Sequence, residues 1–486
     1  MIGRMDISTP SATELRSCFD AQHRASRAAP EVPLALRLDR LQRISTLLDT
    51  HGAALAAAVQ ADFGVRAPQL TEVADIFVLR TLLSHTRKHL RGWMKPQKVS
   101  TPISLQPSRG ELQRQPLGVV GVISPWNYPV QLALAPVITA LAAGNRVMLK
   151  PSELTPRTSA LMAELLHQQF AADELRVVLG DASVASDFAS LPFDHLLFTG
   201  STPVGRKVAQ AAAANLTPTT LELGGKSPCI VGLGADMDDA ALKIAHGKLL
   251  NAGQTCLAPD YVLLPQGQEQ AFEQAYGRAV ARLFPSIMGN GDYAAIISPR
   301  HLARLQQLLD EAQAQGAVVR QIASAGERSE KGTGRQMLPT LVTQTRDAMT
   351  LMQEEIFGPI LPVLPYAALD DAITYINARP RPLALYWFGP DTAARDAVLR
   401  RTVSGGVTVN DTLMHIAHEN LPFGGVGPSG MGHYHGWGAY HGESGFLRFT
   451  QQKPVFFQSR WAAGSLFYPP YGKRLEQVMG MLRRIL

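Results

Sequence analysis

Short β-rich runs alternate with helical runs from Leu117 onward, and this alternation constrains the fold more than any other feature of the chain. The β-rich runs are short and apolar, whereas the runs between them place apolar residues at helical spacing. Such alternation is typical of βαβ units, which build a parallel sheet with helices on both faces. We therefore predict a doubly wound parallel sheet from the successive runs 118–123, 130–143, 146–150, 158–170, 175–179, 195–198 and 204–214.

The remaining segments complete an α/β architecture. A second α/β stretch covers about 235–410, and 486 residues with 46% apolar side chains suffice for two or three domains. Residues 34–63 have helical spacing and are followed by Gly64, a plausible helix stop. The polar, Pro-punctuated stretch 95–116 predicts an extended hairpin or arm, and the Gly-rich stretch 421–445 predicts loops.

The net charge of +6 comes from Lys and Arg residues that are scattered along the whole chain. Because these residues form no dense cluster, the charge does not indicate a nucleic-acid-binding arm. We interpret it as a solvated surface that helps to attract anionic cofactors.

The three cysteines, Cys18, Cys229 and Cys256, are too few and too separated for a disulfide scaffold or a zinc site. Residues 1–30 lack the apolar core of a signal peptide, and no run approaches the roughly 18 to 20 apolar residues that span a bilayer. We therefore expect a cytoplasmic protein in which a cysteine can serve as a reactive thiol. Cys18 and Cys229 lack a suitable setting and are predicted to be structural.

Asn127 lies in a turn directly after the predicted strand 118–123. Open α/β sheets bind ligands at the carboxyl ends of their strands, where an amide NH2 can donate to a developing oxyanion. A turn Asn whose side chain bonds to the local backbone is the commoner case.

Gly200, Ser201 and Gly205 follow the strand 195–198 and precede an Ala-rich helix. Glycines and small hydroxyl residues before a helix N-terminus suit a dinucleotide phosphate. The spacing is not GxGxxG, so an ordinary strand-to-helix turn explains this motif equally well.

Glu222 is a single carboxylate among apolar residues and glycines. Such a group must be paired, hydrogen-bonded or raised in pKa, and a raised pKa suits a general base. A structural salt bridge is the commoner role of a lone Glu.

Cys256 follows Gly253 in a turn beyond a predicted helix. A thiol in a polar turn can be accessible and have a lowered pKa, as a nucleophile needs. Most free cysteines are instead small core residues.

Together and in this order, the motifs resemble the aldehyde dehydrogenase superfamily over nearly the whole chain. The resemblance rests on the segments 222–228, 253–256, 354–359 and 422–425. The segments 124–129, 258–261 and 427–432 are similar to the class 3 branch, which acts on fatty and aromatic aldehydes. The ending 468–473 looks most like that branch's bacterial coniferyl aldehyde dehydrogenase group.

The resemblance implies that Cys256 attacks the aldehyde and that the Asn127 amide and the Cys256 backbone N–H hold the oxyanion. After hydride transfer, Glu222 would activate the water that hydrolyses the thioester. The family pattern places Lys150 and Glu153 at the adenine-side ribose. It also places Gly200 and Ser201 at the pyrophosphate, with Gly205 in the same turn, Glu355 at the nicotinamide ribose and Phe357 beside the nicotinamide.

The expected cofactor is NAD, because the Glu153 carboxylate favours a free ribose 2′-hydroxyl over a phosphate. Lys150 nearby could tolerate a phosphate, so NADP stays open.

The domain organisation follows the same pattern. We expect a dinucleotide-binding domain at 1–97 and 116–223, a catalytic domain at 224–423, an oligomerisation arm at 98–115 and about 445–460, and a tail at 461–486. Because short two-stranded ribbons are only marginally stable alone, we expect the arm to pair across the subunits of a homodimer.

The chain departs from the family pattern at 437–442, where a short segment looks like a local duplication. A longer loop is the simplest interpretation, and an altered substrate entrance or dimer contact is the functional one. We expect no metal at His433, His435 and His441, which would need a fourth ligand.

Two other functions remain open. A CoA-acylating aldehyde dehydrogenase would pass the thioester to a thiol, but such enzymes generally lack the carboxylate base that Glu222 supplies. A non-catalytic cofactor-binding protein of the same fold would not need Asn127, Glu222 and Cys256 together.

Overall fold

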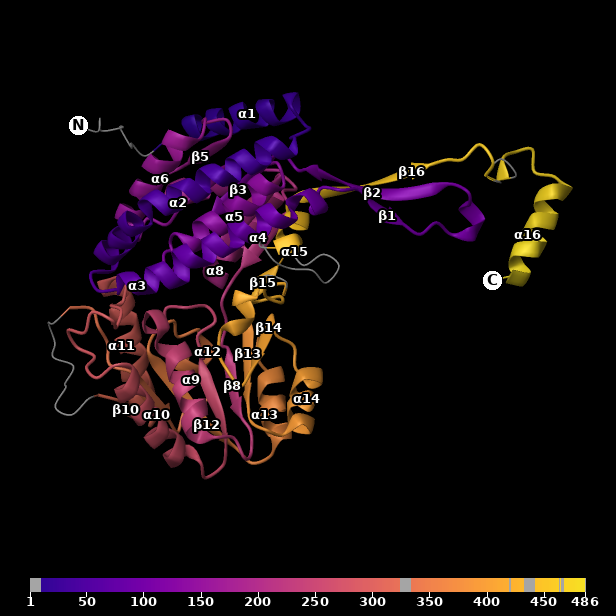
Figure 1. Ribbon diagram of the computed structural model, residues 1–486. Helices are drawn as coiled ribbons and strands as arrows, with labels where there is room; N and C mark the ends of the chain where they lie inside the picture. Colours follow the sequence, from indigo (N-terminus) through magenta and orange to yellow (C-terminus); the bar gives the residue numbers. More distant parts are fainter. Residues whose placement is uncertain are drawn as a thin grey trace.

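The computed structural model describes residues 10–323, 334–418, 421–431, 442–462, 464 and 467–485. Within these residues the strands form three sheets (Figure 1). Two sheets lie in the two halves of the body, and the third forms an arm that projects from it (Figure 1). The predicted α/β class is confirmed.

The six-stranded sheet has the order β15-β7-β6-β3-β4-β5. Its neighbouring strands are parallel, apart from the antiparallel pair of β15 and β7. The strands are β3 (Val119–Ile123), β4 (Arg146–Lys150), β5 (Leu175–Val177), β6 (His195–Thr199), β7 (Thr219–Glu222) and β15 (Gly430–Met431). The predicted doubly wound sheet therefore forms from the runs that the sequence indicated.

Helices cover both faces of the six-stranded sheet. In β3, Val119 and Ile123 pack into one apolar cluster and Val120 and Val122 into another, as the two-residue period of a strand requires. On the first face lie α1 (Ala12–Ala28), α7 (Ala182–Ala189) and α8 (Thr202–Ala213). On the second lie α2 (Leu34–Phe63), α4 (Val78–Trp93), α5 (Gln131–Ala142) and α6 (Pro156–Gln169).

The seven-stranded sheet has the order β10-β11-β12-β9-β8-β13-β14. The strands are parallel except for β10, which pairs antiparallel with β11. They are β8 (Pro228–Val231), β9 (Tyr261–Pro265), β10 (Val318–Gln321), β11 (Thr340–Thr343), β12 (Ile360–Tyr366), β13 (Ala384–Phe388) and β14 (Gly406–Val409). This sheet confirms the second predicted α/β stretch.

Apolar clusters again lie on both faces of this sheet. On one face, strand residues pack with α9 (Met237–Leu249), α10 (Glu269–Leu283) and α11 (Pro299–Ala314). On the other, Ile230, Leu263 and Leu385 pack with α13 (Leu369–Asn377) and α14 (Thr392–Arg401). The sheet is therefore a buried layer that fixes the loops at its strand ends.

Helix α2 spans Leu34–Phe63 as predicted and ends at Gly64. Gly64 has a φ of 79°, which a side chain would disfavour. After α2, the short α3 (Pro68–Thr71) and the π-helix η1 (Glu72–Phe77) lead into α4. Asp75 of η1 is buried, and its role is described with the site below.

The arm is an antiparallel sheet of the order β1-β2-β16. Strand β2 (Arg109–Pro116) pairs with β1 (Gln97–Val99) and, over its full length, with β16 (Thr450–Phe457). The predicted extended hairpin is thus present, with η2 (Ile103–Leu105) at its turn. The segment after Gly445 supplies β16, which pairs with β2 of the same chain and completes a three-stranded sheet. The expected pairing of the arm across subunits stays a prediction.

The C-terminal part contains more regular structure than the sequence indicated. The stretch 421–445, predicted as loops, contributes β15 and the start of α15 (Gly442–Arg448), and the tail contains α16 (Lys473–Ile485) at the far end of the arm (Figure 1). Residues 432–441 lie outside the described residues, and so do most of the predicted insertion and its neighbouring histidines.

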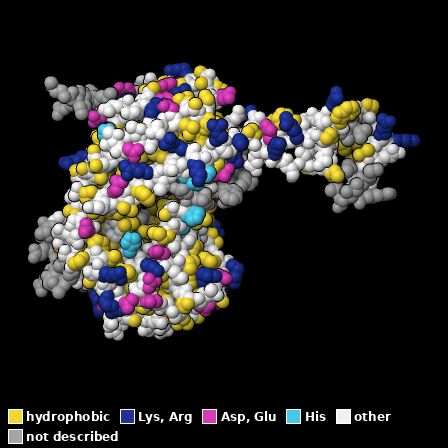
Figure 2. Space-filling view, viewed as in Figure 1, with side chains coloured by type: hydrophobic (Ala, Val, Ile, Leu, Met, Phe, Trp, Pro, Cys, Tyr) yellow, Lys and Arg dark blue, Asp and Glu magenta, His cyan; other side chains and the backbone are white. Residues whose placement is uncertain are grey.

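Figure 2 shows Lys and Arg side chains dispersed over the body and along the arm. This distribution agrees with the predicted solvated surface. Within the described ranges, no helix combines the length and the apolar character needed to cross a bilayer. The predicted domain boundaries stay a prediction.

Candidate active site

The predicted catalytic residues meet where the two large sheets face each other. Asn127 and Glu222 lie at the carboxyl ends of β3 and β7, whereas Cys256 and Glu355 precede β9 and β12. The amino ends of one sheet therefore face the carboxyl ends of the other. The Asn127 side chain spans this junction by donating to the Gln254 carbonyl oxygen, 3.1 Å away.

An unusual turn presents Cys256. After α9, the helix η3 (Leu250–Gly253) contains Asn251 and Ala252 with φ values of 52° and 53°. Gly253 follows with a φ of 77°, and a Cβ there would collide with the Gly358 backbone. Three successive residues in the left-handed region reverse the chain and place Cys256 just beyond it.

Gln254 holds this turn in place. Its side chain is buried, and its amide group donates to the carbonyl oxygens of Asn251 at 2.9 Å and Ala295 at 3.0 Å. Its side-chain oxygen accepts the Ile297 backbone N–H at 2.9 Å. Since these bonds reach a separate segment, the turn is anchored from outside as well as within.

The Cys256 thiol is half-buried, and its environment favours the protonated form. Burial, followed by the nearby carboxylates of Glu355 and Glu222, raises the pKa of Cys256 to about 12. The backbone N–H groups of Cys256 and Leu257 act in the opposite direction. The expectation of a lowered thiol pKa was wrong, so a base must remove the proton before attack.

Glu222 is buried at the end of β7, and burial raises its pKa to about 8, although the Arg448 cation acts in the opposite direction. Its Oε2 has no hydrogen-bond partner among the described residues. The raised pKa matches the sequence prediction for a general base. Arg448 lies in α15 and was not predicted, because nothing in the sequence places that segment opposite β7.

Asn127 is held by a buried ion pair that the sequence did not reveal. The Arg66 guanidinium donates to the Asn127 backbone carbonyl at 2.6 Å and to Asp75 Oδ2 at 2.9 Å. Asp75 Oδ1 accepts the backbone N–H groups of Val130 and Gln131 at 3.2 and 3.0 Å. The pair therefore fixes both sides of the loop that carries Asn127. A charged residue inside an apolar helical pattern was the signal that could have indicated it.

Lys150 ends β4, and its buried Nζ donates to the Pro151 carbonyl oxygen at 3.0 Å and to Glu153 Oε2 at 3.4 Å. Glu153 is 45% exposed, so its carboxylate is accessible to a ligand beside the strand end. The structure thus brings together the two residues that the sequence assigned to the adenine-side ribose. Burial lowers the pKa of Lys150, although Glu153 raises it.

Gly200 and Gly205 allow close packing at the start of α8. A Cβ at Gly200 would collide with the Phe198 ring, and one at Gly205 would collide with the Leu223 side chain. Ser201 is the N-cap residue of α8, and its side chain makes no capping hydrogen bond. The first turn of α8 is largely exposed, and its backbone N–H groups, which Pro203 lacks, have no partner within the helix and so suit the pyrophosphate of a dinucleotide.

Glu355 and Phe357 lie in the loop before β12. The Glu355 carboxylate accepts the Gly225 backbone N–H, and a Cβ at Gly224 would overlap that carboxylate. Burial raises the pKa of Glu355 to about 8. Phe357 has a φ of 54°, and its ring packs edge-on against Trp126 with centroids 5.4 Å apart. Trp126 precedes Asn127, so this loop lies against the segment that carries Asn127.

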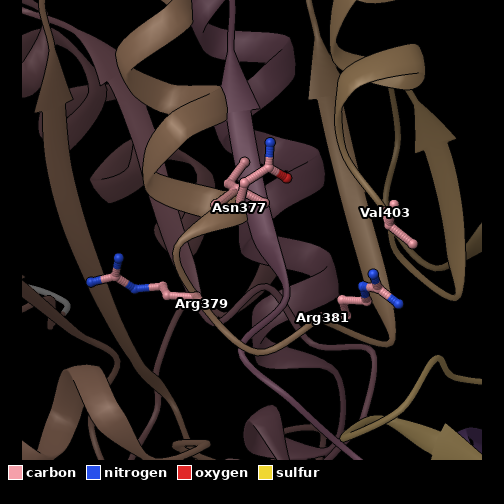
Figure 3. Close-up of a pocket in the computed structure, with 5 residues that line it drawn as sticks. Asn377, Arg379, Arg381 and Val403 are labelled. Atoms are coloured by element: carbon pink, nitrogen blue, oxygen red, sulfur yellow. The ribbon is translucent and has the colours of Figure 1, made fainter.

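A cavity elsewhere in the structure lies between the end of α13 and β13, where Asn377, Arg379, Arg381 and Val403 line it (Figure 3). No predicted site residue lines this cavity. Arg379 pairs with Asp347, and its guanidinium lies 3.3 Å from the centre of the Tyr375 ring. The cavity therefore plays no part in the site at the sheet junction.

The three cysteines are all unpaired, and Cys229 is fully buried in β8. In the part of the chain that the structure describes, no group of His, Cys, Asp and Glu side chains could hold a metal ion.

The chain matches the model of the Aldehyde dehydrogenase family over residues 4–455. It is 47% identical over 478 residues to a probable coniferyl aldehyde dehydrogenase of Pseudomonas aeruginosa, covering 98% of both chains. It is 37% identical to aldehyde dehydrogenase family 3 member B1 of Rattus norvegicus, covering 98% of this chain and 97% of the relative.

Solved structures agree with this relationship. The substrate-bound AldH of Staphylococcus aureus is 36% identical, with a TM-score of 0.89 and coverage of 96% of this chain and 99% of that one. The indole-3-acetaldehyde dehydrogenase of P. syringae, solved with NAD+, is 25% identical, with a TM-score of 0.82 and coverage of 93% and 90%.

Proposed function

The chain belongs to the aldehyde dehydrogenase family, and from this premise we propose how its residues oxidise an aldehyde with NAD(P). It is an aldehyde-oxidising oxidoreductase that resembles class 3 members. The observation that carries the mechanism is the position of the half-buried Cys256 thiol close to two carboxylates, the buried Glu222 and the half-buried Glu355.

In the first step, the Cys256 sulfur attacks the aldehyde carbon, and a base accepts the thiol proton. The new C–S bond converts the carbonyl into an oxyanion, which the Asn127 amide and the Cys256 backbone N–H stabilise. Asn127 has two amide hydrogens, and one is committed to the Gln254 carbonyl. The second remains for the oxyanion.

When bound, NAD(P) would serve as acceptor for a hydride from the carbon bonded to Cys256, so that Cys256 would then carry the acyl group as a thioester. The residues present fit a dinucleotide, since the first turn of α8 is largely exposed and the Ser201 side chain makes no capping hydrogen bond there. Lys150 and Glu153 would hold the adenine-side ribose, and Glu355 the nicotinamide ribose. The accessible Glu153 carboxylate favours NAD over NADP by charge.

In the last step, Glu222 accepts a proton from water as the water attacks the thioester. The C–S bond breaks, the carboxylic acid leaves and the thiol is restored. A carboxylate with a pKa near 8 is a stronger base than an ordinary one, which suits this task.

We assign an aromatic, cinnamyl-type aldehyde such as coniferyl aldehyde as the first substrate to test. The basis is the 47% identity to a probable coniferyl aldehyde dehydrogenase over nearly the whole chain. Long-chain aldehydes are the second substrate class to test, because the chain resembles class 3 members. The retained base Glu222 favours hydrolysis over acyl transfer to CoA.

We also propose that the protein is a homodimer. The arm and the residues after it expose large apolar side chains, which a single copy leaves uncovered. Figure 2 shows hydrophobic and basic side chains together on the projecting end. These side chains include Ile103 at 81%, Trp461 at 75%, Tyr468 at 70% and Tyr471 at 71% exposure.

A cytoplasmic location remains our expectation from the three unpaired cysteines.

The test is a comparison of kcat/KM for coniferyl aldehyde, benzaldehyde and a long aliphatic aldehyde, with NAD and with NADP. We expect NADH formation and the free acid as product, also when CoA is added. An acyl-CoA product would show that the enzyme transfers the acyl group to CoA and does not hydrolyse the thioester. The absence of NAD(P)H formation with every aldehyde would contradict the proposed activity.

A further inference from the structure

Asp260 lies at the point where the nucleophile segment passes into β9, four residues after Cys256. It is 2% exposed, and its two carboxylate oxygens contact two different segments. Oδ2 accepts a hydrogen bond from Lys226 Nζ at 2.5 Å, and Oδ1 accepts the Ile356 backbone N–H at 3.2 Å. Ile356 lies between Glu355 and Phe357, so the carboxylate directly holds the loop 354–357, termed here the cofactor loop.

Lys226 extends the same connection. Besides Asp260, its Nζ donates to the carbonyl oxygens of Leu351 at 2.8 Å and Glu354 at 3.0 Å. Lys226 itself follows Glu222 by four residues. The Asp260–Lys226 pair therefore joins three segments, which carry the nucleophile, the proposed base and the cofactor loop.

Lys248 adds a second buried cation. Its side chain is fully buried, and Nζ lies 3.9 Å from Asp260 Oδ1 without a hydrogen-bond partner among the described residues. Asp260 is thus the shared counter-charge of Lys226 and Lys248. Removing the counter-charge from a buried cation is costly, so the stability and the positioning effects of Asp260 must be separated.

The cofactor loop needs external support. Phe357 has a φ of 54°, a strained value for a large side chain, and such a backbone persists only where its surroundings fix it. Arg304 supports the loop from the other side by donating to the carbonyl oxygens of Ile356 at 2.8 Å and Glu355 at 2.7 Å.

We propose that Asp260, acting with Lys226, is a positioning residue that sets the cofactor loop against the Cys256 turn. This inference rests on the proposed function, in which Glu355 and Phe357 hold the nicotinamide side. A displacement of about 1 Å between reacting groups can cost on the order of 100-fold in rate. The Asp260–Lys226 pair keeps the hydride acceptor within reach of the carbon bound to Cys256.

The experiment compares Asp260→Asn, Asp260→Asn with Lys248→Met, and Lys226→Met with the parent enzyme. The double variant removes the unpaired buried cation while Asn still accepts the Ile356 N–H. For each we would measure the melting temperature, KM for NAD, kcat and the rate of Cys256 alkylation by iodoacetamide. Asp238→Asn, which breaks an exposed pair with Arg278, serves as the matched control.

We expect Asp260→Asn and Lys226→Met to raise KM for NAD on the order of 10-fold, with cysteine alkylation within about 2-fold of the parent. In the double variant the melting temperature should recover while KM for NAD stays raised. Recovery of both together would assign Asp260 a merely structural role and overturn the inference. A normal KM for NAD in Lys226→Met would also overturn it, and this variant decides the question if the Asp260 variants fail to fold.

Glu355→Gln separates this inference from the proposed function. An unchanged KM for NAD in Glu355→Gln would refute the cofactor role of the loop itself. A raised KM in Glu355→Gln together with a normal KM in Lys226→Met would instead refute only the positioning role.

Discussion

The Arg66 guanidinium lies 2.6 Å from the backbone carbonyl oxygen of Asn127 and 2.9 Å from Asp75 Oδ2, and both charged side chains are fully buried. The amide that we propose to bind the oxyanion is thus held in place by an ion pair from a different segment of the chain. Removing one partner leaves an uncompensated charge in the core, which costs about 3–5 kcal/mol.

We predict that Asp75→Ala lowers the free energy of unfolding by about 3–5 kcal/mol. It should also lower kcat, because the loop from Asn127 to Gln131 loses its anchor. Urea denaturation and steady-state kinetics check both effects. Asp238→Ala, at an exposed pair with Arg278, should change stability by less than about 1 kcal/mol. Equal effects in the two variants would contradict the role of burial.

Cys256→Ala should abolish dehydrogenase turnover while NAD binding stays near normal. The thiol forms the covalent bond to the substrate but contributes little to holding the dinucleotide. Turnover by absorbance at 340 nm and NAD binding by calorimetry check the two parts. Cys229→Ala is the matched control and should stay active, since Cys229 is buried in β8. An acyl adduct on Cys229 would refute the assignment of the nucleophile.

Much of the fold followed from local pattern, because the runs that became β3, β4 and β6 are short, apolar and separated by helical spacing. Helix α2 was predicted with its bounds, since Gly64 marks its end directly. The sequence grouped the two segments of the arm, but it could not show that β2 pairs with β16 of the same chain, because a polar ribbon does not specify whether its partner strand comes from the same chain or from a second copy. Strand β16 is more than 300 residues away and pairs within the chain.

The candidate site could likewise be predicted only in part from the sequence. Residues inside compact motifs, such as Glu222 and Cys256, were found from the sequence, and the structure brings them to one junction. Arg66, Asp75 and Arg448 were missed because each acts on a segment far from it along the chain. The thiol pKa was predicted in the wrong direction, since a polar turn does not reveal that the thiol becomes buried or that two carboxylates from other segments lie near it.

Because His195 is buried, we predict that the protein loses stability in acid. It is buried in β6, its Nε2 lies 2.9 Å from Thr220 Oγ1, and burial lowers its pKa from 6.5 to about 3. A group with a lowered pKa in the folded state contributes stability above 6.5 that is lost as the pH falls toward 3. The unfolding temperature of the parent should therefore fall between pH 7 and pH 5 more than that of His195→Leu. Parallel pH dependence in the two proteins would exclude His195 as the cause.

From the exposed apolar side chains of the arm and the tail, we predict that the protein forms a homodimer in a concentration-dependent manner. Since Trp461, Tyr468 and Tyr471 are each at least 70% exposed, their burial in a second copy would stabilise a dimer. Light scattering at micromolar concentration should give twice the mass of one chain. Truncation after residue 458 should weaken the dimer, and a monomeric parent protein would contradict the proposal.

Glu222→Gln decides between hydrolysis and thiol transfer. Water is a weak nucleophile at neutral pH, so the thioester persists unless a base removes a proton during the attack, an effect typically worth about 10² to 10⁴ in rate. The amide keeps the size of the side chain but cannot accept that proton. We expect a burst of NADH near one equivalent per competent site, followed by slow turnover, with an acyl adduct on Cys256 by mass spectrometry.

The pH dependence sharpens this test. The base form of Glu222 increases as the pH rises through its pKa of about 8, so steady-state turnover of the parent enzyme should rise over the same range. In Glu222→Gln this rise should disappear from the slow phase while the burst persists.

Normal turnover in the variant would remove Glu222 from the mechanism. Loss of burst and turnover together would mean that Glu222 removes the thiol proton instead, because the Cys256 pKa is raised to about 12 and attack then requires a base. In that case iodoacetamide alkylation of Cys256 should slow in Glu222→Gln, whereas a misfolded variant would show a lowered melting temperature.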